Sequence, residues 1–569
     1  MAQQRASDAI KHSLGAFAHG AARRDAGITR VKYHALVPLL AALRGRLHTP
    51  AGIVVTVAVV ALAHQIWYLV VESRAVGSLG FPLDDGWIHL QFARNLARDG
   101  QLAFNRFEPS SGSTSPLWTL LLAAPLALHV EPVAAAKGLG MMLAAACAGL
   151  GATLAGELTH HRGAAWCAGL AIACSARMTW SGVSGMEGPL YVALALATLL
   201  VYLRDPDAGA RWWGLLGALS GTARPETFLL LPLLVIHRAV VAWRSGRWIE
   251  ARRPLIEATT VAAGVALAYA IVNLSGGPYP WPSTFGAKEE GRGLLSAIGA
   301  SDTRAILRSA LDGLGAVNLF VRFFFEQSAL LAMLLLPGAM AVAAGLGQHH
   351  PRGMVVLWAA LLGPLTIGMM APALPVTLQQ GRYVAHALAL GFVIASVGLA
   401  GLWRVGGRRG GLILTAVAAL AIARLASQDI AFATRHAQMV GNIESLHGQV
   451  AHWIRMRTRP DALIAANDIG ALAWFSERRV LDLEGLVTPD IVPHKAARTH
   501  LTFLEQQKPD YLVIFPQWYP HLAARTDLFR EVHRVSSPRV SAAHDTTVVY
   551  STPWLDSQAR EPAASDEQR

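Results

Sequence analysis

The chain has 569 residues, of which 53% are hydrophobic and only 15% are charged, whereas about 25% of residues are charged in a typical soluble protein. The formal net charge is +12, but the Lys and Arg residues lie in short segments between long apolar runs. This placement is typical of loops that orient membrane spans, so the composition predicts a multi-pass membrane protein and argues against a nucleic-acid partner.

Residues 1–48 form a basic segment that is expected to be a cytoplasmic tail. They contain eight Lys and Arg residues, which is too many over too long a stretch for a cleavable signal peptide. The first apolar run, near 51–71, then crosses the membrane, so the loop 72–115 is expected on the outer side. The next apolar run, 116–130, is short and contains Pro125, and is predicted to lie along the membrane interface.

Ten further apolar runs follow within a transmembrane module that is assigned to 49–429. They lie near 134–157, 164–178, 188–203, 212–223, 226–243, 255–273, 324–346, 353–371, 383–403 and 411–427. With 116–130 at the interface, every basic group between spans falls on the cytoplasmic side. The positive-inside rule therefore predicts about eleven crossings and an outer C-terminus. The three cysteines lie in these runs and are predicted to be core residues.

From residue 430 the apolar runs shorten to strand length. Strand-like patterns occur at 461–468, 478–486, 509–516 and 545–552, and a short helix is expected at 469–476. Strands that alternate with helices predict a small α/β domain outside the membrane, assigned to 430–556. The polar tail, 557–569, is predicted to be disordered.

The strongest candidate for chemistry is the outer segment 81–118, which carries the adjacent carboxylates Asp84 and Asp85. A surface helix is expected to follow them, with Asp85 as its cap and His89 in its first turns. We interpret the pair as a catalytic base, a metal ligand or both, because a carboxylate can accept the proton of an attacking hydroxyl. The alternative is helix capping with solvation.

Two further outer loops contain candidate binding residues. The stretch PSSGSTSPLW, which includes Ser113, is rich in hydroxyl groups. It either binds phosphate or sugar or starts the next helix, with Ser115 as the cap and Pro116 in the first position. The loop GGPYPWPSTFGAKEE carries Lys288 among prolines and aromatic residues. Such a loop either binds sugars or prenyl chains or simply lies at the membrane interface.

Ionisable residues also stand at the outer ends of predicted spans. Glu187 either complements a helix dipole or adds a second acidic group to the site. Arg224 and Glu226 form a local pair or serve function at membrane depth. Arg382, beside Tyr383, either binds phosphate oxygens in a fork or anchors the membrane surface. Because the predicted topology places all these groups on one face, we expect an outward-facing site for a substrate with a phosphate head and a lipid tail.

In these motifs the chain resembles the GT-C membrane glycosyltransferases. Within that class it is similar to the bacterial branch that includes terminal arabinofuranosyltransferases and protein O-mannosyltransferase-like enzymes. The matching pieces run in order between about 81 and 516, and they are LDDGWIH, FNRFEPSSGSTSPLW, SGMEGPLYVAL, TARPE, QGRY, AANDIGALAWFSERRVLDLEGL and PDYLVIFP.

The resemblance implies a polytopic GT-C-like enzyme of the bacterial inner membrane. Such enzymes transfer a sugar from a polyprenyl-phosphate donor to an extracytoplasmic glycan, lipid or protein, by single displacement with inversion. It implies that Asp84 or Asp85 is the base, and that Arg382 or Lys288 binds the donor phosphate. Members differ in metal use, so a divalent metal on the acidic pair is left open and no other cofactor is expected.

Two other functions fit parts of the sequence. A transporter or flippase of a lipid-linked saccharide would use the same arginines, but such proteins often have two similar halves, and none are visible here. A receptor or scaffold would explain the C-terminal domain but not the charged outer segment 81–118.

Overall fold

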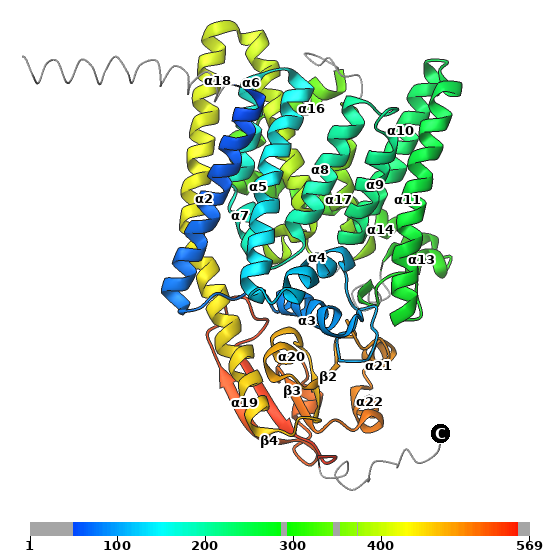
Figure 1. The fold of residues 1–569 in the computed structure, drawn as a ribbon, viewed down its shortest axis with the longest axis vertical. Coiled ribbons are helices and arrows are strands. Elements are labelled where there is room, and N and C mark those ends of the chain that lie inside the picture. Colours follow the sequence, from blue (N-terminus) through cyan, green and yellow to red (C-terminus); the bar gives the residue numbers. More distant parts are fainter. Residues whose placement is uncertain (1–48, 286–292, 345–352, 373, 556–569) are drawn as a thin grey trace, which may run out of the picture.

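The computed structural model describes residues 49–285, 293–344, 353–372 and 374–555. A bundle of long helices forms the larger part, and a domain containing a β-sheet is packed against one end of it (Figure 1). The short helices α3 and α4 lie at that same end, between the long helices and the sheet domain (Figure 1). The bundle therefore has two distinct ends.

The helical part follows the predicted apolar runs closely. Its elements are α2 (Pro50–Val76), α3 (Asp84–Asp99), α4 (Pro116–Ala127), α5 (Pro132–Thr159), α6 (Arg162–Ala173), α7 (Ala176–Val183), α8 (Gly188–Arg204), α9 (Ala210–Ala223), η1 (Pro225–Leu229), α10 (Leu230–Arg244), α11 (Trp248–Gly276), α13 (Leu294–Gly299), α14 (Thr303–Gln327), α15 (Ala329–Ala332), α16 (Leu335–Ala344), α17 (Met354–Met370), η2 (Leu378–Val384) and α18 (Ala385–Ile443). Gly407 has non-helical backbone angles, so α18 consists of two helices joined by a turn.

Several of these helices are long and apolar enough to span a bilayer. Among the described residues, five candidate spans meet both criteria, or six if the bent pair α7 and α8 counts as one span. The apolar helices α4, α15 with α16, and α17 are shorter. The chain is therefore a multi-pass membrane protein, and the figure of about eleven crossings stays a prediction.

Basic residues between the spans meet at the end of the bundle away from the sheet domain. Arg404 donates a hydrogen bond to the Thr159 carbonyl oxygen at 2.7 Å, and Arg204 pairs with Glu157 at 3.4 Å. These contacts bring together the ends of α5 and α8 and the turn of α18 (Figure 1). The gathering is what the predicted topology requires of its cytoplasmic side.

Two predicted spans are divided in the structure. The run predicted at 324–346 begins inside α14 and continues as α15 and α16. Pro337 explains the second break, because proline lacks an N–H group and clashes with the carbonyl group four residues earlier. The run predicted at 164–178 is split between α6 and α7, and α7 meets α8 at an angle of 117°. Helix α14, which starts well before the predicted span, was missed because its sequence is amphipathic and charged.

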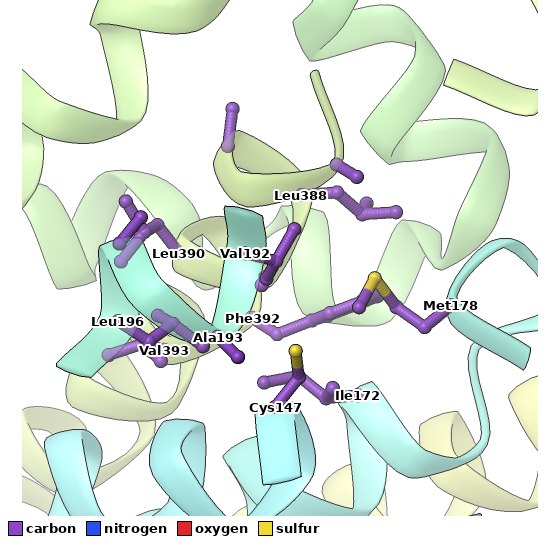
Figure 2. Close-up of a cluster of buried hydrophobic side chains, with 14 of the residues drawn as sticks. Cys147, Ile172, Met178, Val192, Ala193, Leu196, Leu388, Leu390, Phe392 and Val393 are labelled. Atoms are coloured by element: carbon purple, nitrogen blue, oxygen red, sulfur yellow. The ribbon is translucent and has the colours of Figure 1, made fainter. Parts of the chain in front are cut away.

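The apolar core of the bundle lies where four segments meet. Figure 2 shows Cys147 of α5, Ile172 of α6, Val192 of α8 and Phe392 of α18 pointing into one cluster. All three cysteines are free and buried, as predicted for core residues.

The C-terminal domain contains one mixed sheet. Its elements are η3 (Glu444–Gly448), α19 (Gln449–Arg457), β1 (Leu463–Ala466), α20 (Gly470–Ser476), β2 (Arg479–Asp482), α21 (Ile491–Ala497), α22 (His500–Gln507), β3 (Tyr511–Ile514), α23 (Pro520–Ala523), β4 (Arg530–Ser536) and β5 (Thr546–Ser551). The strand order is β2-β1-β3-β5-β4; β1 pairs in parallel with β2 and β3, and β5 is antiparallel to β3 and β4. The four predicted strands and α20 are confirmed. The edge strand β4 was missed, because its sequence is largely polar and exposed.

Candidate active site

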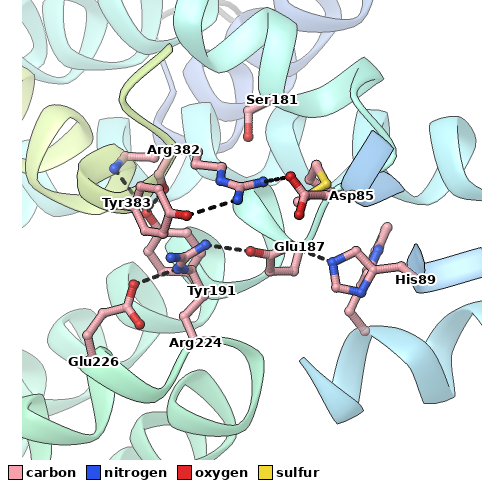
Figure 3. A network of polar contacts seen from close by, with 12 residues as sticks. Asp85, His89, Ser181, Glu187, Tyr191, Arg224, Glu226, Arg382 and Tyr383 are labelled. Atoms are coloured by element: carbon pink, nitrogen blue, oxygen red, sulfur yellow. Dashed lines mark hydrogen bonds and ion pairs between the residues drawn. The ribbon is translucent and has the colours of Figure 1, made fainter. Parts of the chain in front are cut away.

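A chain of buried polar contacts links α3 to the N-terminus of α8 and the C-terminus of α9. His89 Nε2 lies 3.0 Å from Glu187 Oε2. Glu187 Oε1 accepts a hydrogen bond from an Arg224 terminal nitrogen at 2.5 Å. Arg224 Nε donates to Glu226 Oε1 at 2.6 Å. Figure 3 shows these four side chains in one row. The two carboxylates thus share Arg224, which is the pairing that buried charges require.

A second ion pair, between Arg382 and Asp85, lies beside this row (Figure 3). One terminal nitrogen of Arg382 donates to Asp85 Oδ2 at 2.9 Å, and the other donates to the Tyr383 hydroxyl at 2.9 Å. The Asp85 side chain is 30% exposed, whereas that of Arg382 is 7% exposed. The Nε atom of Arg382 is buried and has no hydrogen-bond partner among the described residues. Arg382 therefore has one N–H donor, at Nε, still available, and it is paired with the Asp85 carboxylate, which solvent can reach.

The backbone around Arg382 is held in an unusual conformation. Gln379, Gln380 and Gly381 all have positive φ angles, so η2 is a tight, irregular turn. The Tyr191 hydroxyl donates to the Arg382 carbonyl oxygen at 2.8 Å and accepts the N–H of the residue that starts α18. Such strained segments are often held in place at functional sites. The turn fixes the direction in which the Arg382 guanidinium points.

The rings of two tyrosines lie against the two arginines of the site. The Arg224 guanidinium lies 4.6 Å from the centre of the Tyr383 ring and 5.4 Å from that of Tyr191. The Arg382 guanidinium lies 4.9 Å from the Tyr383 ring. Tyr383 is therefore in contact with both arginines, and the aromatic faces stabilise two cations held close together.

Asp84 turns away from this network and binds the C-terminal domain. Its carboxylate accepts the backbone N–H groups of Gly470 and Ala471, at 2.6 and 2.8 Å, at the start of α20. Burial raises the pKa of Asp84, while the interaction with His447 and these two N–H donors oppose the rise. The predicted cap of α3 was wrong: Leu83 precedes the helix and no side chain caps it. The negative charge of the Asp84 carboxylate instead interacts favourably with the positive, N-terminal end of the α20 helix dipole.

Arg94 makes the matching contact at the other end of α20. It donates to the carbonyl oxygens of Trp474 and Ala473, at 3.1 and 3.4 Å, and lies over the Trp474 ring. Helix α3 thus carries an acid at the N-terminus of α20 and a base at its C-terminus. Together these contacts form a clasp, defined here as Asp84 and Arg94 of α3 with α20. The helix that bears Asp85 and His89 is held by the C-terminal domain.

The hydroxyl-rich loop between α3 and α4 serves packing. Ser113 Oγ lies 3.1 Å from Thr119 Oγ1, and Ser110 Oγ donates to the Val487 carbonyl oxygen at 3.4 Å. A Cβ atom on Gly112 would lie 2.7 Å from the Leu486 carbonyl oxygen, so the loop runs directly against the C-terminal domain. No hydrogen bond joins Ser113 to the charged network. The predicted capping bond of Ser115 is absent as well, although Pro116 does open α4.

Seven of the ten predicted site residues meet in the network, namely Asp85, His89, Glu187, Arg224, Glu226, Arg382 and Tyr383. Asp84 adjoins them but faces α20, Ser113 packs elsewhere, and Lys288 lies outside the described residues. Sequence reasoning missed Tyr191, whose position in an apolar helix gives no local signal. It also missed Arg94, whose partners are about 380 residues away. Within the described parts of the chain, no group of three or more His, Cys, Asp or Glu side chains could hold a metal ion.

Comparison with known proteins finds one family model and several solved structures. A family model described as a domain of unknown function, DUF8728, matches residues 429–552. No curated protein matches the chain. Among solved structures, ArnT from Cupriavidus metallidurans in the apo state is similar over 85% of this chain and 96% of its own, with a TM-score of 0.53 and 12% identity.

The same protein bound to undecaprenyl phosphate gives a TM-score of 0.52 at 11% identity over the same shares of the two chains. The likeness shows that the chain shares the overall fold of ArnT, a helical membrane module with a C-terminal sheet region. The expected architecture of a helical membrane module with a small C-terminal sheet domain is confirmed, and membership of the GT-C class and of a branch within it stays a prediction.

Proposed function

We propose that the protein is a polyprenyl-phosphate-dependent glycosyltransferase whose active site is the network around Asp85 and Arg382. The observation that carries the proposal is the ion pair between these two residues, which joins a solvent-accessible carboxylate to a buried guanidinium with a spare donor. The shared fold supports the proposal, because one of the similar ArnT structures is bound to undecaprenyl phosphate.

In this proposal Asp85 is the general base. The oxygen of an acceptor hydroxyl forms a bond to the anomeric carbon of the donor sugar, and the bond from that carbon to the phosphate oxygen breaks. The bonding electron pair leaves with polyprenyl phosphate, and Asp85 accepts the hydroxyl proton. A single displacement inverts the anomeric carbon and needs no second carboxylate as a nucleophile. Asp84 is less suited to the role because its carboxylate is directed at the N–H groups of α20 and not at Arg382.

Arg382 is proposed to bind the donor phosphate. A guanidinium binds phosphate oxygens in a fork, and its unpartnered Nε is available for one of them. When the donor phosphate binds Arg382, it competes with Asp85 for the guanidinium. The ion pair with Asp85 is then weakened, so the carboxylate can accept a proton. Arg224, which also lies against the Tyr383 ring, stabilises the charge of the leaving phosphate, while Glu187 and His89 fix Arg224 relative to α3.

The remaining assignments follow from the predicted topology. The site is proposed to open on the outer face of the bacterial inner membrane, with the N-terminus in the cytoplasm. The acceptor is proposed to be a cell-envelope glycan, lipid or protein. The basic residues that gather at the opposite end of the bundle support this orientation.

The test uses the full chain in proteoliposomes with a panel of radiolabelled undecaprenyl-phosphate sugars and with cell-envelope glycans, lipids and proteins as acceptors. Release of undecaprenyl phosphate from at least one donor is expected, and the variant Asp85→Asn should release it at least about a hundredfold more slowly. The control is Glu250→Gln, which removes a carboxylate that is 67% exposed. No release from any donor would refute the proposal, and movement of the intact lipid-linked sugar across the bilayer would favour a flippase.

A further inference from the structure

A small, partly open cavity lies in the C-terminal domain at the carboxyl ends of β1 and β3. It is lined by residues that include His447, Asn467, Asp468 and Thr547. Strand β1 lies between β2 and β3. The chain therefore places β2 next to one edge of β1 and β3 next to its other edge. Ligands of parallel sheets bind outside the carboxyl ends of the strands at this kind of reversal point.

The cavity presents polar atoms that have no protein partner. Asn467 is 4% exposed, and its Oδ1 accepts the N–H of Phe515 at 3.1 Å. Both residues line the cavity. Asn467 Nδ2 and Thr547 Oγ1 are buried and make no hydrogen bond with the described residues. The same holds for His447 Nε2, which lies 3.6 Å from Asp468 Oδ2. Buried polar atoms without partners cost free energy, so each indicates a missing ligand or water.

We propose that this cavity is the acceptor subsite and that it binds a neutral hydroxyl group of a saccharide. A hydroxyl group both donates and accepts hydrogen bonds, so it can donate to Asp468 while it accepts from Asn467 Nδ2. An alkylammonium group only donates and would leave the Asn467 amide unpaired. A phosphate carries negative charge, which the carboxylates around Asp468 oppose.

Asp468 connects the cavity to the clasp that holds the helix of the proposed base. Asp468 stands two residues before Gly470, which binds Asp84, and it interacts electrostatically with both Asp84 and Asp85. Burial raises the pKa of Asp468, and the neighbouring carboxylates raise it further. The field at the cavity is therefore negative, which opposes an anionic acceptor and admits a neutral one.

The inference rests on the proposed function, but its first test does not need turnover. Binding of methyl glucoside, methyl glucoside 6-phosphate and methylammonium to the full chain in nanodiscs would be measured by saturation-transfer NMR. Methyl glucoside is expected to bind the wild type and the control Asp461→Asn, whose carboxylate is 76% exposed. Its signal should fall at least fivefold in Asp468→Asn and in Asn467→Asp, which replaces the amide donor with an acceptor of the same shape.

Equal methyl glucoside signals in all four proteins would overturn the subsite, and stronger binding of the phosphate or the ammonium ligand would overturn the ligand class. The outcomes also separate the two proposals. Binding that depends on Asp468 without release of polyprenyl phosphate from any donor would refute the transferase and leave a hydroxyl-binding site. Release by both Asp468→Asn and the wild type, with the same acceptor KM, would retain the transferase and refute the subsite.

Discussion

The substitution Gly470→Ala tests whether the C-terminal domain holds the helix that carries the proposed base. A Cβ atom on Gly470 would lie 2.2 Å from the Asp84 backbone oxygen and 2.9 Å from its carboxylate. The first distance is shorter than any real contact, and the obstacle is backbone, so α3 and α20 must separate. The two N–H bonds to Asp84 are then weakened or lost.

The size of the effect follows from the contacts that break. A hydrogen bond to a charged group contributes about 1.5–3 kcal/mol, and loss of one such bond from the clasp is expected to cost about 2 kcal/mol. If the loss appears as misplacement of Asp85, kcat falls at least tenfold, because about 1.4 kcal/mol corresponds to a factor of ten in rate. The backbone amide hydrogens of α3 should exchange with deuterium faster, because α20 no longer holds α3 in place.

Hydrogen–deuterium exchange of α3 and turnover would be measured on the same preparations. The matched control is Gly441→Ala in α18, where the added Cβ would meet Val76 Cγ2 at an ordinary 3.6 Å. Unchanged exchange in α3 together with kcat within twofold of the control would refute the clasp as a positioning device.

Two further predictions concern stability. Lys137 and Glu72 pair at 2.8 Å with side chains 1% and 0% exposed. Lys137→Met should lower stability by about 1.5–3 kcal/mol, because it removes one hydrogen bond to the buried carboxylate, which keeps the Gly80 N–H and His436 as partners. Thermal melting should show a clear loss against Arg247→Gln, which breaks an exposed pair; equal melting temperatures would contradict the argument. Burial raises the pKa of Asp482 from 3.8 to about 6, and at 1.36 kcal/mol per pH unit this difference amounts to about 3 kcal/mol. The folded state binds this proton more tightly, so the stabilisation is present below about pH 4 and is lost as the pH rises to about 6. Over this pH range the melting temperature should fall more steeply with rising pH in the wild type than in Asp482→Asn. The same pH dependence in both proteins would show that Asp482 does not titrate this way.

Much of the bundle could be predicted from its sequence because apolar length and charge placement are local properties. The runs that became α2, α5 and α11 are long and uninterrupted, and the gathering of site residues followed from topology alone. Breaks such as the one before Pro337 could be foreseen only by weighing that residue against the apolar run around it. The amphipathic α14 was missed because its buried face is not reflected in its average composition.

The roles of the two adjacent aspartates could not be separated from the sequence. Both belong to the first turn of α3, and successive helix residues point about 100° apart, so one faces Arg382 and the other faces α20. That division depends on partners about 300 and 386 residues away, which no local pattern encodes. The packing of the hydroxyl-rich loop against residues 486–487 could not be predicted for the same reason, and its binding role stays a prediction.

The most direct test of the account is the single-turnover rate of sugar transfer at saturating donor in Asp85→Asn, with donor affinity measured separately. If Asp85 is the base, the rate falls by about 10²- to 10⁴-fold, the usual contribution of a general base. Donor affinity should be retained, because Arg382 loses its competing carboxylate. Asp84→Asn should keep more activity, since that variant weakens only the contact with α20. A rate in Asp85→Asn within threefold of the wild type would contradict the account.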